Sequence, residues 1–483
     1  MDKPSVSNST SYCSPADVRR SLSYLMPQLA PYWERPLTAY ASKLYRVEHV
    51  SAESAARNHA KDLFRTCIER AARRSSYTEE EARSAGRELV ASPVLQTGPH
   101  CLLLFEPDAF YTHLFSMMGL MAHNRNWYIS YFASTSGFSE RAKKGPGWLR
   151  VGGEPLNLFG VPRNRMDSSS IGCLNGPYRY ALTNAKGESA PNADAACLLA
   201  NLPSAEFASA AEAIKAGNRD LWRRTFSQSI RLLQLDDFDV ADLIADHLED
   251  PTSWISSQFI GNRTIANSIL TALDDLQAGP WAGWIRRTTD FFWRISENRV
   301  TPLHLKGDAL ISDNAPTFSV RFRPDAIAAA LRNRLILPNL LLAFLAISIL
   351  PGVRVLGGFR QVVYYPLMRY LTSAGIQQAG NADLLADMVN DNQPGVWGHR
   401  VLRRAESDPF HEVNIAGGIA PLLQAYGKLS LSDASGDLTC FTEDCLWSRL
   451  AANIANGTIA SASDEWRWSD KGSRGALSRR RCI

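Results

Sequence analysis

Cys101-Leu-Leu-Leu-Phe105 is an apolar run of the length of a buried strand, and Trp127-Tyr-Ile-Ser-Tyr-Phe-Ala133 is a second one. Between them, apolar side chains recur at helical spacing from Pro107 to His123. A strand, a helix and a strand in this order are typical of a parallel sheet, because parallel neighbours need a crossover connection. We therefore expect an α/β protein with a Rossmann-like parallel sheet.

Helical and strand-like patterns alternate on both sides of this unit. Thr78 and the three glutamates after it predict a capped helix start. The alternating run Phe318-Ser-Val-Arg-Phe322 predicts a strand, and the periodic residues 220–235 predict a helix. We expect a helical N-terminal region at 1–92, the first part of the α/β core at 93–204, a large helical insertion at 205–297, the second part of the core at 298–375, and a loop and helical region with a basic tail at 376–483.

The composition limits the possible function classes. Of the 483 residues, 45% are hydrophobic, which is enough for a large core and excludes wholesale disorder. The net charge of +4 argues against a dedicated nucleic-acid binder. The eight cysteines include no CxxC pair, so we expect reduced thiols and no metal site. The aspartates between Asp236 and Asp246 lack the pattern of a calcium loop, and we expect a solvated helix face or a capping cluster.

One uncharged segment, at 335–353, approaches the length of a membrane span. Pro338 and Pro351 interrupt it near both ends, so a buried helix followed by a buried strand is the better interpretation. The N-terminal residues carry no apolar secretory signal. We expect a cytoplasmic protein and keep membrane attachment through 335–353 as an alternative.

The chain contains no nucleophile elbow, no HExxH, no P-loop and no GxGxxG. This excludes α/β-hydrolases, zincins and P-loop nucleotide hydrolases. Open parallel sheets bind ligands at the carboxyl ends of their strands, so the loops after the expected strands are the candidate sites.

These loops and their neighbours supply the candidate residues. His100 and His113 flank one expected strand–helix junction and are candidates for proton transfer, although a lone histidine is more often structural. Small residues after an expected strand can expose backbone N–H groups to an anion, and charged or glycine-rich positions can bind or approach a ligand. The candidate ligand-binding residues are Thr97, Gly98, Ser134, Thr135, Ser136, Lys144, Gly357, Gly358, Arg360, Gln361 and Tyr364. For Lys144 a solvated loop is the alternative, and for Arg360 the expected partner is a carboxylate.

Two pieces of the chain resemble one family. Leu95-Gln96-Thr97-Gly98-Pro99, with the strand that ends at Ala133-Ser134, is similar to the N-terminal core of the cysteine-adding enzymes of bacillithiol biosynthesis. The run from Leu335 to Pro351, followed by Val355-Leu-Gly357-Gly358, Gln361 and Tyr364, is similar to a later stretch of that family's sequence. That stretch has an apolar segment, a short strand, a glycine pair and a helix with aromatic residues. The resemblance implies a Rossmann-like core with inserted helices and a condensation of cysteine with an amino sugar. This chain departs from the family where Ser134-Thr135-Ser136-Gly137 replaces an acidic, histidine-containing cluster, and the family's long C-terminal coiled coil is not evident.

The sequence thus favours a cytoplasmic biosynthetic enzyme of specialised metabolism, ligase-like or condensing. Its substrate would be a small polar metabolite, amino-acid-like or phosphate-bearing, and nucleic acid is not an expected partner. A non-catalytic ligand-binding or scaffold protein derived from such an enzyme is the alternative. The residues assign no cofactor and no oligomeric state. The interpretation requires segments 95–137 and 353–365 to meet at one edge of a sheet.

Overall fold

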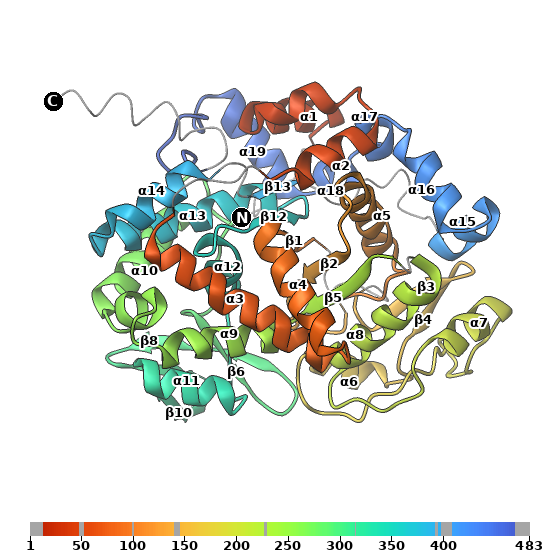
Figure 1. The fold of residues 1–483 in the computed structure, drawn as a ribbon, viewed down its shortest axis with the longest axis horizontal. Helices are drawn as coiled ribbons and strands as arrows, with labels where there is room; N and C mark the ends of the chain where they lie inside the picture. The colour runs from red at the N-terminus through yellow and green to blue at the C-terminus, as the bar shows by residue number, and fades with distance from the viewer. Residues whose placement is uncertain are drawn as a thin grey trace, which may run out of the picture.

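The computed structural model describes residues 13–47, 53–98, 101–139, 145–226, 229–313, 315–391, 395–397 and 408–468. A parallel sheet lies in the middle of the molecule and helices surround it (Figure 1). The expected α/β class is confirmed. The predicted basic tail lies outside the described residues.

The sheet has five strands in the order β13-β12-β1-β2-β5, and every neighbouring pair is parallel. From β1 the chain adds β2 and then β5 on one side, and it later adds β12 and β13 on the other side. All carboxyl ends therefore lie at one edge of the sheet. The strands are β1 Val94–Gln96, β2 Trp127–Tyr131, β5 Arg231–Leu235, β12 Arg354–Gly357 and β13 Gly395–Trp397.

The strand predicted at Cys101–Phe105 is wrong, because the strand that precedes the helix is β1. Residues 101–105 form a buried loop instead. The side chain of Asn218 accepts a hydrogen bond from the Leu104 N–H at 2.8 Å and donates one to the Leu102 carbonyl at 2.9 Å. These bonds satisfy backbone groups that a buried loop would otherwise leave unpaired.

The region 205–297 is not only a helical insertion, because it supplies β5 to the sheet. Leu232, Leu233 and Leu235 are all buried. A strand buried on both faces has no polar alternation, and this is why its pattern was read as the end of a helix.

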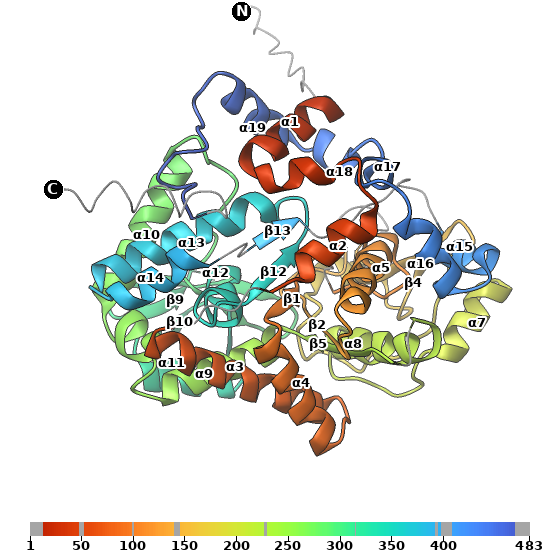
Figure 2. The same ribbon diagram turned by 45° about the horizontal axis from the view of Figure 1, so that its top comes forward.

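The helices on the N-terminal side are α1 Pro15–Leu25, α2 Leu37–Tyr45, α3 Ala55–Arg74 and α4 Glu79–Ala91. Thr78 caps α4 with Glu81 in a capping box, as predicted. Helix α1 packs beside α19, Cys445–Ala455, so the two ends of the described chain meet (Figure 2).

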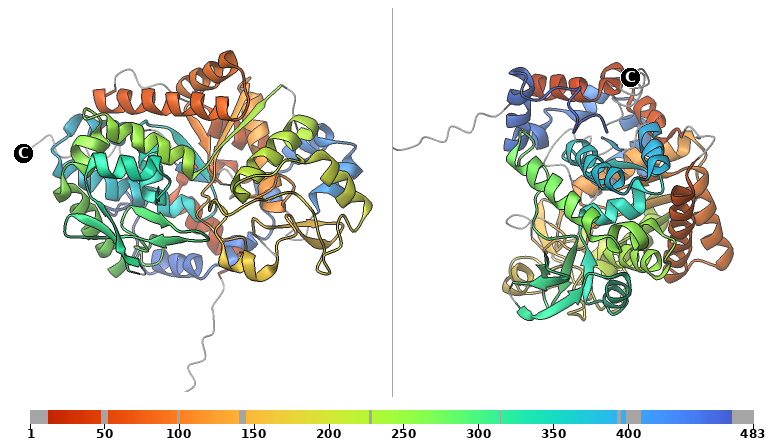
Figure 3. Two further views of the ribbon diagram at one scale, coloured as in Figure 1. Left: turned by 90° about the horizontal axis from the view of Figure 1, so that it is seen from below. Right: turned by 90° about the vertical axis from the view of Figure 1, so that its left-hand side faces the viewer.

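Three helices form a layer on one side of the sheet. Helix α9, Asp237–Glu249, packs between α3 and α11, Pro324–Arg332 (Figure 3). Apart from α12 and α18, which are given below, the other α-helices are α5 Pro107–Ala122, α6 Arg163–Ser168, α7 Ala193–Asn201, α8 Ala210–Leu221, α10 Arg263–Ala278, α13 Gln361–Gln378, α14 Ala382–Asn390, α15 Pro409–Ala416, α16 Ile419–Gly427 and α17 Leu431–Ser435.

Short antiparallel sheets and single helical turns complete the fold. The Gly152-Gly153 hairpin joins β3 Trp148–Val151 to β4 Glu154–Asn157. The remaining elements are β6 Phe292–Ile295, β7 Val300–Pro302, β8 His304–Lys306, β9 Ala309–Ser312, β10 Ala315–Arg321, β11 Ile336–Pro338, α18 Thr439–Thr442, and the turns η1 Pro27–Tyr32, η2 Trp222–Phe226 and η3 Ile255–Ile260.

The uncharged segment 335–353 belongs to the interior of the chain. After β11 it forms the buried helix α12, Leu340–Phe344, and the π-helical turn η4, Leu345–Ile349, and it then leads into β12. The predicted order of buried helix and strand is confirmed. Across the ranges given above, the structure has no helix that combines the length and the apolar character needed to cross a bilayer.

A buried ion network ties α3 to the helices that follow β12. Asp391, just after α14, accepts hydrogen bonds from Arg57 Nη2 at 3.1 Å and from Arg369 Nη1 at 3.0 Å. The side chains of Arg57 and Arg369 are 2% exposed and that of Asp391 is 11% exposed. Burial works to raise the pKa of Asp391, but the two guanidinium groups outweigh it and hold the pKa below its ordinary value.

Candidate functional site

The segments singled out in the sequence meet at the carboxyl edge of the sheet. Thr97 and Gly98 follow β1, Ser134 and its neighbours follow β2, and Gly358 follows β12. The three strands are adjacent in the order β12-β1-β2. The Thr97 N–H donates to the Leu356 carbonyl at 2.7 Å, which joins the two ends directly.

Gln361, in the first turn of α13, lies at the centre of this edge and is 2% exposed. One polar atom of its amide contacts Thr97 Oγ1 at 2.9 Å and the Tyr364 hydroxyl at 3.1 Å. The other amide atom is buried and has no partner among the residues that the structure describes. An amide turned by 180° exchanges nitrogen and oxygen but still leaves one polar atom unpaired. Gly357 makes room for this side chain, because a Cβ there would lie 1.9 Å from Gln361 Cδ.

A second polar group joins the ends of β2 and β5. Asp237, at the start of α9, accepts hydrogen bonds from the Tyr131 hydroxyl at 2.6 Å, the Ser134 N–H at 2.7 Å and the Ser134 hydroxyl at 3.1 Å. Its carboxyl is 2% exposed. Burial raises the pKa of Asp237 to about 6, although the bonds from Tyr131 and Ser134 act in the opposite direction. A carboxyl that titrates near neutral pH at a strand's carboxyl end is suited to proton transfer.

Asp237 gives the protein a specific pH dependence. Its pKa of about 6, against an ordinary 3.8, means that the folded state binds this proton more tightly than the unfolded chain does. The stabilisation is therefore present below about pH 4 and is lost as the pH rises to about 6, an effect of about 3 kcal/mol. Urea unfolding between pH 4 and 7.5 should show the stability of the wild type falling by this amount relative to Asp237→Asn. If the difference in unfolding free energy between the two proteins did not change with pH, the raised pKa of Asp237 would be contradicted.

Some predicted anion-binding groups are taken by the chain's own carboxylates. The Ser134 N–H binds Asp237, and Arg360 pairs through Nε and Nη2 with Asp444 at 2.7 and 2.6 Å. The predicted carboxylate partner of Arg360 is thus found inside the protein, at the N-cap of α19. These two groups are committed to holding the fold.

One further loop donor, the Gly98 N–H, is engaged within the chain. The Gly98 N–H donates to Gln96 Oε1 at 2.9 Å. The Ser136 carbonyl accepts from the Ile171 N–H at 3.0 Å, and the Ser136 hydroxyl is buried with no partner in the described ranges. Thr135 is partly exposed. The carbonyls of Ser134 and Ser136 are therefore paired with the N–H groups of Gly172 and Ile171, and anion binding by Thr135 and Ser136 stays a prediction.

The proton-transfer role predicted for His113 does not fit its surroundings. His113 is fully buried on α5, contacts the Tyr128 hydroxyl at 2.9 Å and packs against the rings of Trp222 and Phe226. Burial lowers its pKa to about 3, so the imidazole is neutral and closed off from solvent. It is a core histidine. His100 and Lys144 lie outside the described residues.

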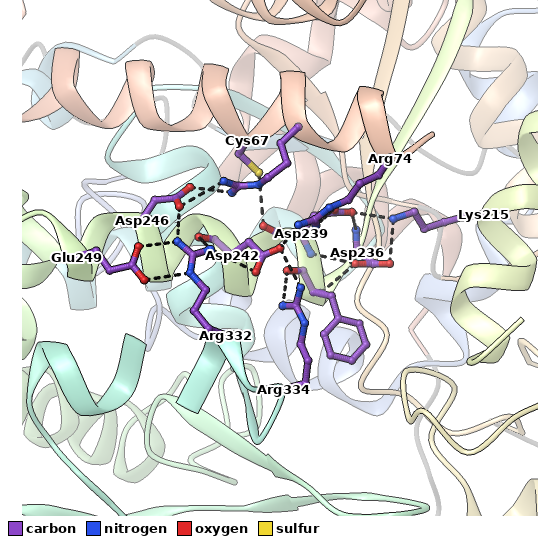
Figure 4. Close-up of polar contacts among 12 residues, drawn as sticks. Cys67, Arg74, Lys215, Asp236, Asp239, Asp242, Asp246, Glu249, Arg332 and Arg334 are labelled. Carbon is purple, nitrogen blue, oxygen red and sulfur yellow. Dashed lines mark hydrogen bonds and ion pairs between the residues drawn. The ribbon is translucent and has the colours of Figure 1, made fainter. Parts of the chain in front are cut away.

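The aspartates that follow β5 are not a solvated helix face, which corrects that prediction. Asp236, Asp239 and Asp242 are buried, and cations from α3, α8 and the end of α11 surround them (Figure 4). Lys215 lies 3.0 Å from Asp236 and 2.7 Å from Asp239. The alternative of a capping cluster is confirmed for Asp236, which caps α9. The other ion pairs of α9 involve Arg70, Arg74, Arg332 and Arg334.

A cavity of about 400 Å³ lies beside β5, and we call it the β5 pocket. Leu232 and Gln234 line it from the strand, Asp236 lines it from the N-cap of α9, and four residues spaced along one face of α8 line it from that helix: Glu212, Lys215, Ala216 and Arg219. Its other walls include Arg74, Arg334, Leu174 and Phe207. Asp236 faces this pocket, whereas the next residue, Asp237, bonds to the end of β2.

Sequence reasoning missed Asp237 and the β5 pocket. The signal was present, because Asp236-Asp237 follows the apolar run Leu232-Leu-Gln-Leu235. Treating that run as a strand would have placed two carboxylates at a carboxyl edge.

In the described part of the chain, no group of three or more histidine, cysteine, aspartate or glutamate side chains is arranged to hold a metal ion. No family model matches the sequence, and no curated protein matches it.

Proposed function

We propose that this chain is a biosynthetic enzyme that joins or modifies a small polar metabolite at the carboxyl edge of β12, β1 and β2. The observation that carries this proposal is the buried amide atom of Gln361, which has no protein partner in the described residues. A buried polar group without a partner costs free energy, and a polar group of a bound substrate would satisfy it. A cytoplasmic location and the resemblance to the cysteine-adding enzymes stay predictions.

The strand order supports a Rossmann-like core and the position of the site. The order changes direction between β1 and β12, and in open parallel sheets ligands bind outside the carboxyl ends at such a point. Thr97 and Gln361 lie there, one from each strand's end.

The residues divide into a binding group and a proton-transfer group. Gln361, held by Thr97 and Tyr364, would orient a polar group of the substrate. Asp237 would accept a proton from an amine, thiol or hydroxyl group of the substrate. Because the carboxyl is buried, the proton would pass through the hydroxyl of Tyr131 or Ser134.

A non-catalytic ligand-binding protein is the second candidate, and a specific observation favours it. Ser134 and Arg360, two predicted anion ligands, bind carboxylates of the chain itself. A protein in which these groups are bound to its own carboxylates can still bind a metabolite and leave it chemically unchanged.

The experiment compares Gln361→Ala with Gln377→Ala, which removes an exposed glutamine from the same helix. Pools of polar metabolites are screened by thermal shift, and those that bind are incubated with the protein and analysed by mass spectrometry. We expect the wild type and Gln377→Ala to form product at equal rates and Gln361→Ala to lose at least tenfold, because it lacks the orienting amide.

The outcomes separate the candidates. Binding without product in the wild type supports the second candidate. Equal turnover by Gln361→Ala and Gln377→Ala removes the proposed site.

A further inference from the structure

The β5 pocket contains two charged side chains, Glu212 and Arg219, that form no ion pair with the described residues. Among the described residues, Arg219 pairs with no carboxylate, and its one recorded bond is from Nη1 to the Ser75 carbonyl at 2.9 Å. In the same part of the chain, the Glu212 carboxylate forms no ion pair with a lysine or arginine. Both side chains line the cavity.

The other charges of the pocket are already compensated. Lys215 is held between Asp236 and Asp239, and Arg74 and Arg334 both bond to Asp242 (Figure 4). A ligand that took one of these groups would have to break a partly buried ion pair, which is costly. Glu212 and Arg219 are free of that cost.

The two uncommitted charges lie at opposite ends of one helix face. They are seven residues apart on α8, about 10 Å along the axis of a helix. Ala216 and Lys215 lie between them on that face, and Leu174 and Phe207 contribute apolar surface to the same cavity. Because Asp236 and Asp239 neutralise Lys215, the pocket offers one cation and one anion outside ion pairs, with apolar surface beside them.

We infer that the β5 pocket binds an elongated zwitterion, a small molecule with a carboxylate or phosphate at one end and an ammonium group at the other. The anionic end bonds to the Arg219 guanidinium. The ammonium end bonds to Glu212, and a short aliphatic linker lies against Ala216, Leu174 and Phe207. A volume of about 400 Å³ accommodates a molecule of this size. The inference rests on this pocket alone and does not depend on the proposed activity.

The test uses three probes of one length on the full chain at low ionic strength: 6-aminohexanoate, hexanoate and hexylamine. Calorimetric titration should show 6-aminohexanoate binding at least tenfold more tightly than either singly charged probe. Arg219→Gln should weaken 6-aminohexanoate and hexanoate at least tenfold and leave hexylamine unchanged. Glu212→Gln should weaken 6-aminohexanoate and hexylamine and leave hexanoate unchanged.

Arg223→Gln is the matched control, because Arg223 lies one turn after Arg219, is 71% exposed and pairs with Asp220 outside the pocket. Arg219→Lys keeps the charge and should retain part of the affinity, which separates loss of binding from loss of folding. The inference fails if none of the probes binds, if hexanoate equals 6-aminohexanoate, or if Arg219→Gln behaves like Arg223→Gln. The titrations do not measure turnover at the Gln361 edge. A negative result at the β5 pocket would therefore leave the proposed function unaffected.

Discussion

Replacing Asp391 with alanine should destabilise the protein by about 3–5 kcal/mol, because it removes the carboxylate that two buried guanidinium groups share. Arg57 and Arg369 are both 2% exposed and both bond to this carboxylate. Arg369 would keep its bonds to the carbonyls of Trp468 and Met388, and Arg57 would keep only a 3.8 Å contact with Asp387 and a long bond to the Ile349 carbonyl. Carbonyls do not neutralise charge. Chemical unfolding of the purified variant measures the loss.

Asp325→Ala provides the control for that experiment. Asp325 also pairs with an arginine, Arg323, but both side chains are more than half exposed. An exposed pair contributes little, so its removal should change stability by about 0.5 kcal/mol or less. Similar effects of the two substitutions would contradict the role given to the buried network.

Replacing Lys215 with methionine should cost about 3–5 kcal/mol at pH 7. Lys215 is the cation between Asp236 and Asp239, whose side chains are each 4% exposed. Although burial works to lower the pKa of Lys215, the two carboxylates raise it, so the ammonium stays charged. Without it, two buried carboxylates remain, and Asp236 has only backbone N–H donors left.

The stability lost on replacing Lys215 with methionine should become smaller as the pH falls. Buried carboxylates that repel each other take up protons at a higher pH than usual. Lowering the pH therefore removes the repulsion in the variant, whereas in the wild type Lys215 already offsets that repulsion. Unfolding at pH 5 and pH 7 should therefore show a smaller difference at pH 5. Lys306→Met, which removes an exposed lysine paired with Asp313, should show little effect at either pH. A loss that does not change between these pH values would exclude an electrostatic origin.

The parts of the fold that could be predicted from sequence are those with a complete local pattern. The apolar residues of α5 recur at helical spacing, and the continuous apolar run of β2 follows them. Strand β12 is followed by glycines and then by α13. The same patterns led to Gln361 and Tyr364, because they follow β12 and its glycines, whereas Thr97 was named as the residue before an expected strand at 101–105 and in fact follows β1.

The rest depends on contacts between distant residues. Strand β1 has only three residues, whereas the apolar loop after it is longer and has the pattern of a strand. That loop is stabilised by Asn218, more than a hundred positions away. Asp237 reaches Ser134 across 103 positions, and Arg360 reaches Asp444 across 84. No local pattern shows which distant carboxylate will bind a predicted anion-binding residue. The pairing of Ser134 with Asp237 and of Arg360 with Asp444 could therefore not be predicted from the sequence.

The central position of β1 has a consequence for how the chain is made. On one side β1 pairs with β2, but its other neighbour, β12, lies about 259 positions further along the chain. A chain emerging from the ribosome therefore carries an unpaired edge on its middle strand until most of the polypeptide has been synthesised. Such late, long-range strand pairing slows folding and leaves nascent chains prone to aggregate. Production of the protein should accordingly benefit from slow expression at low temperature and from chaperones that shield open strand edges.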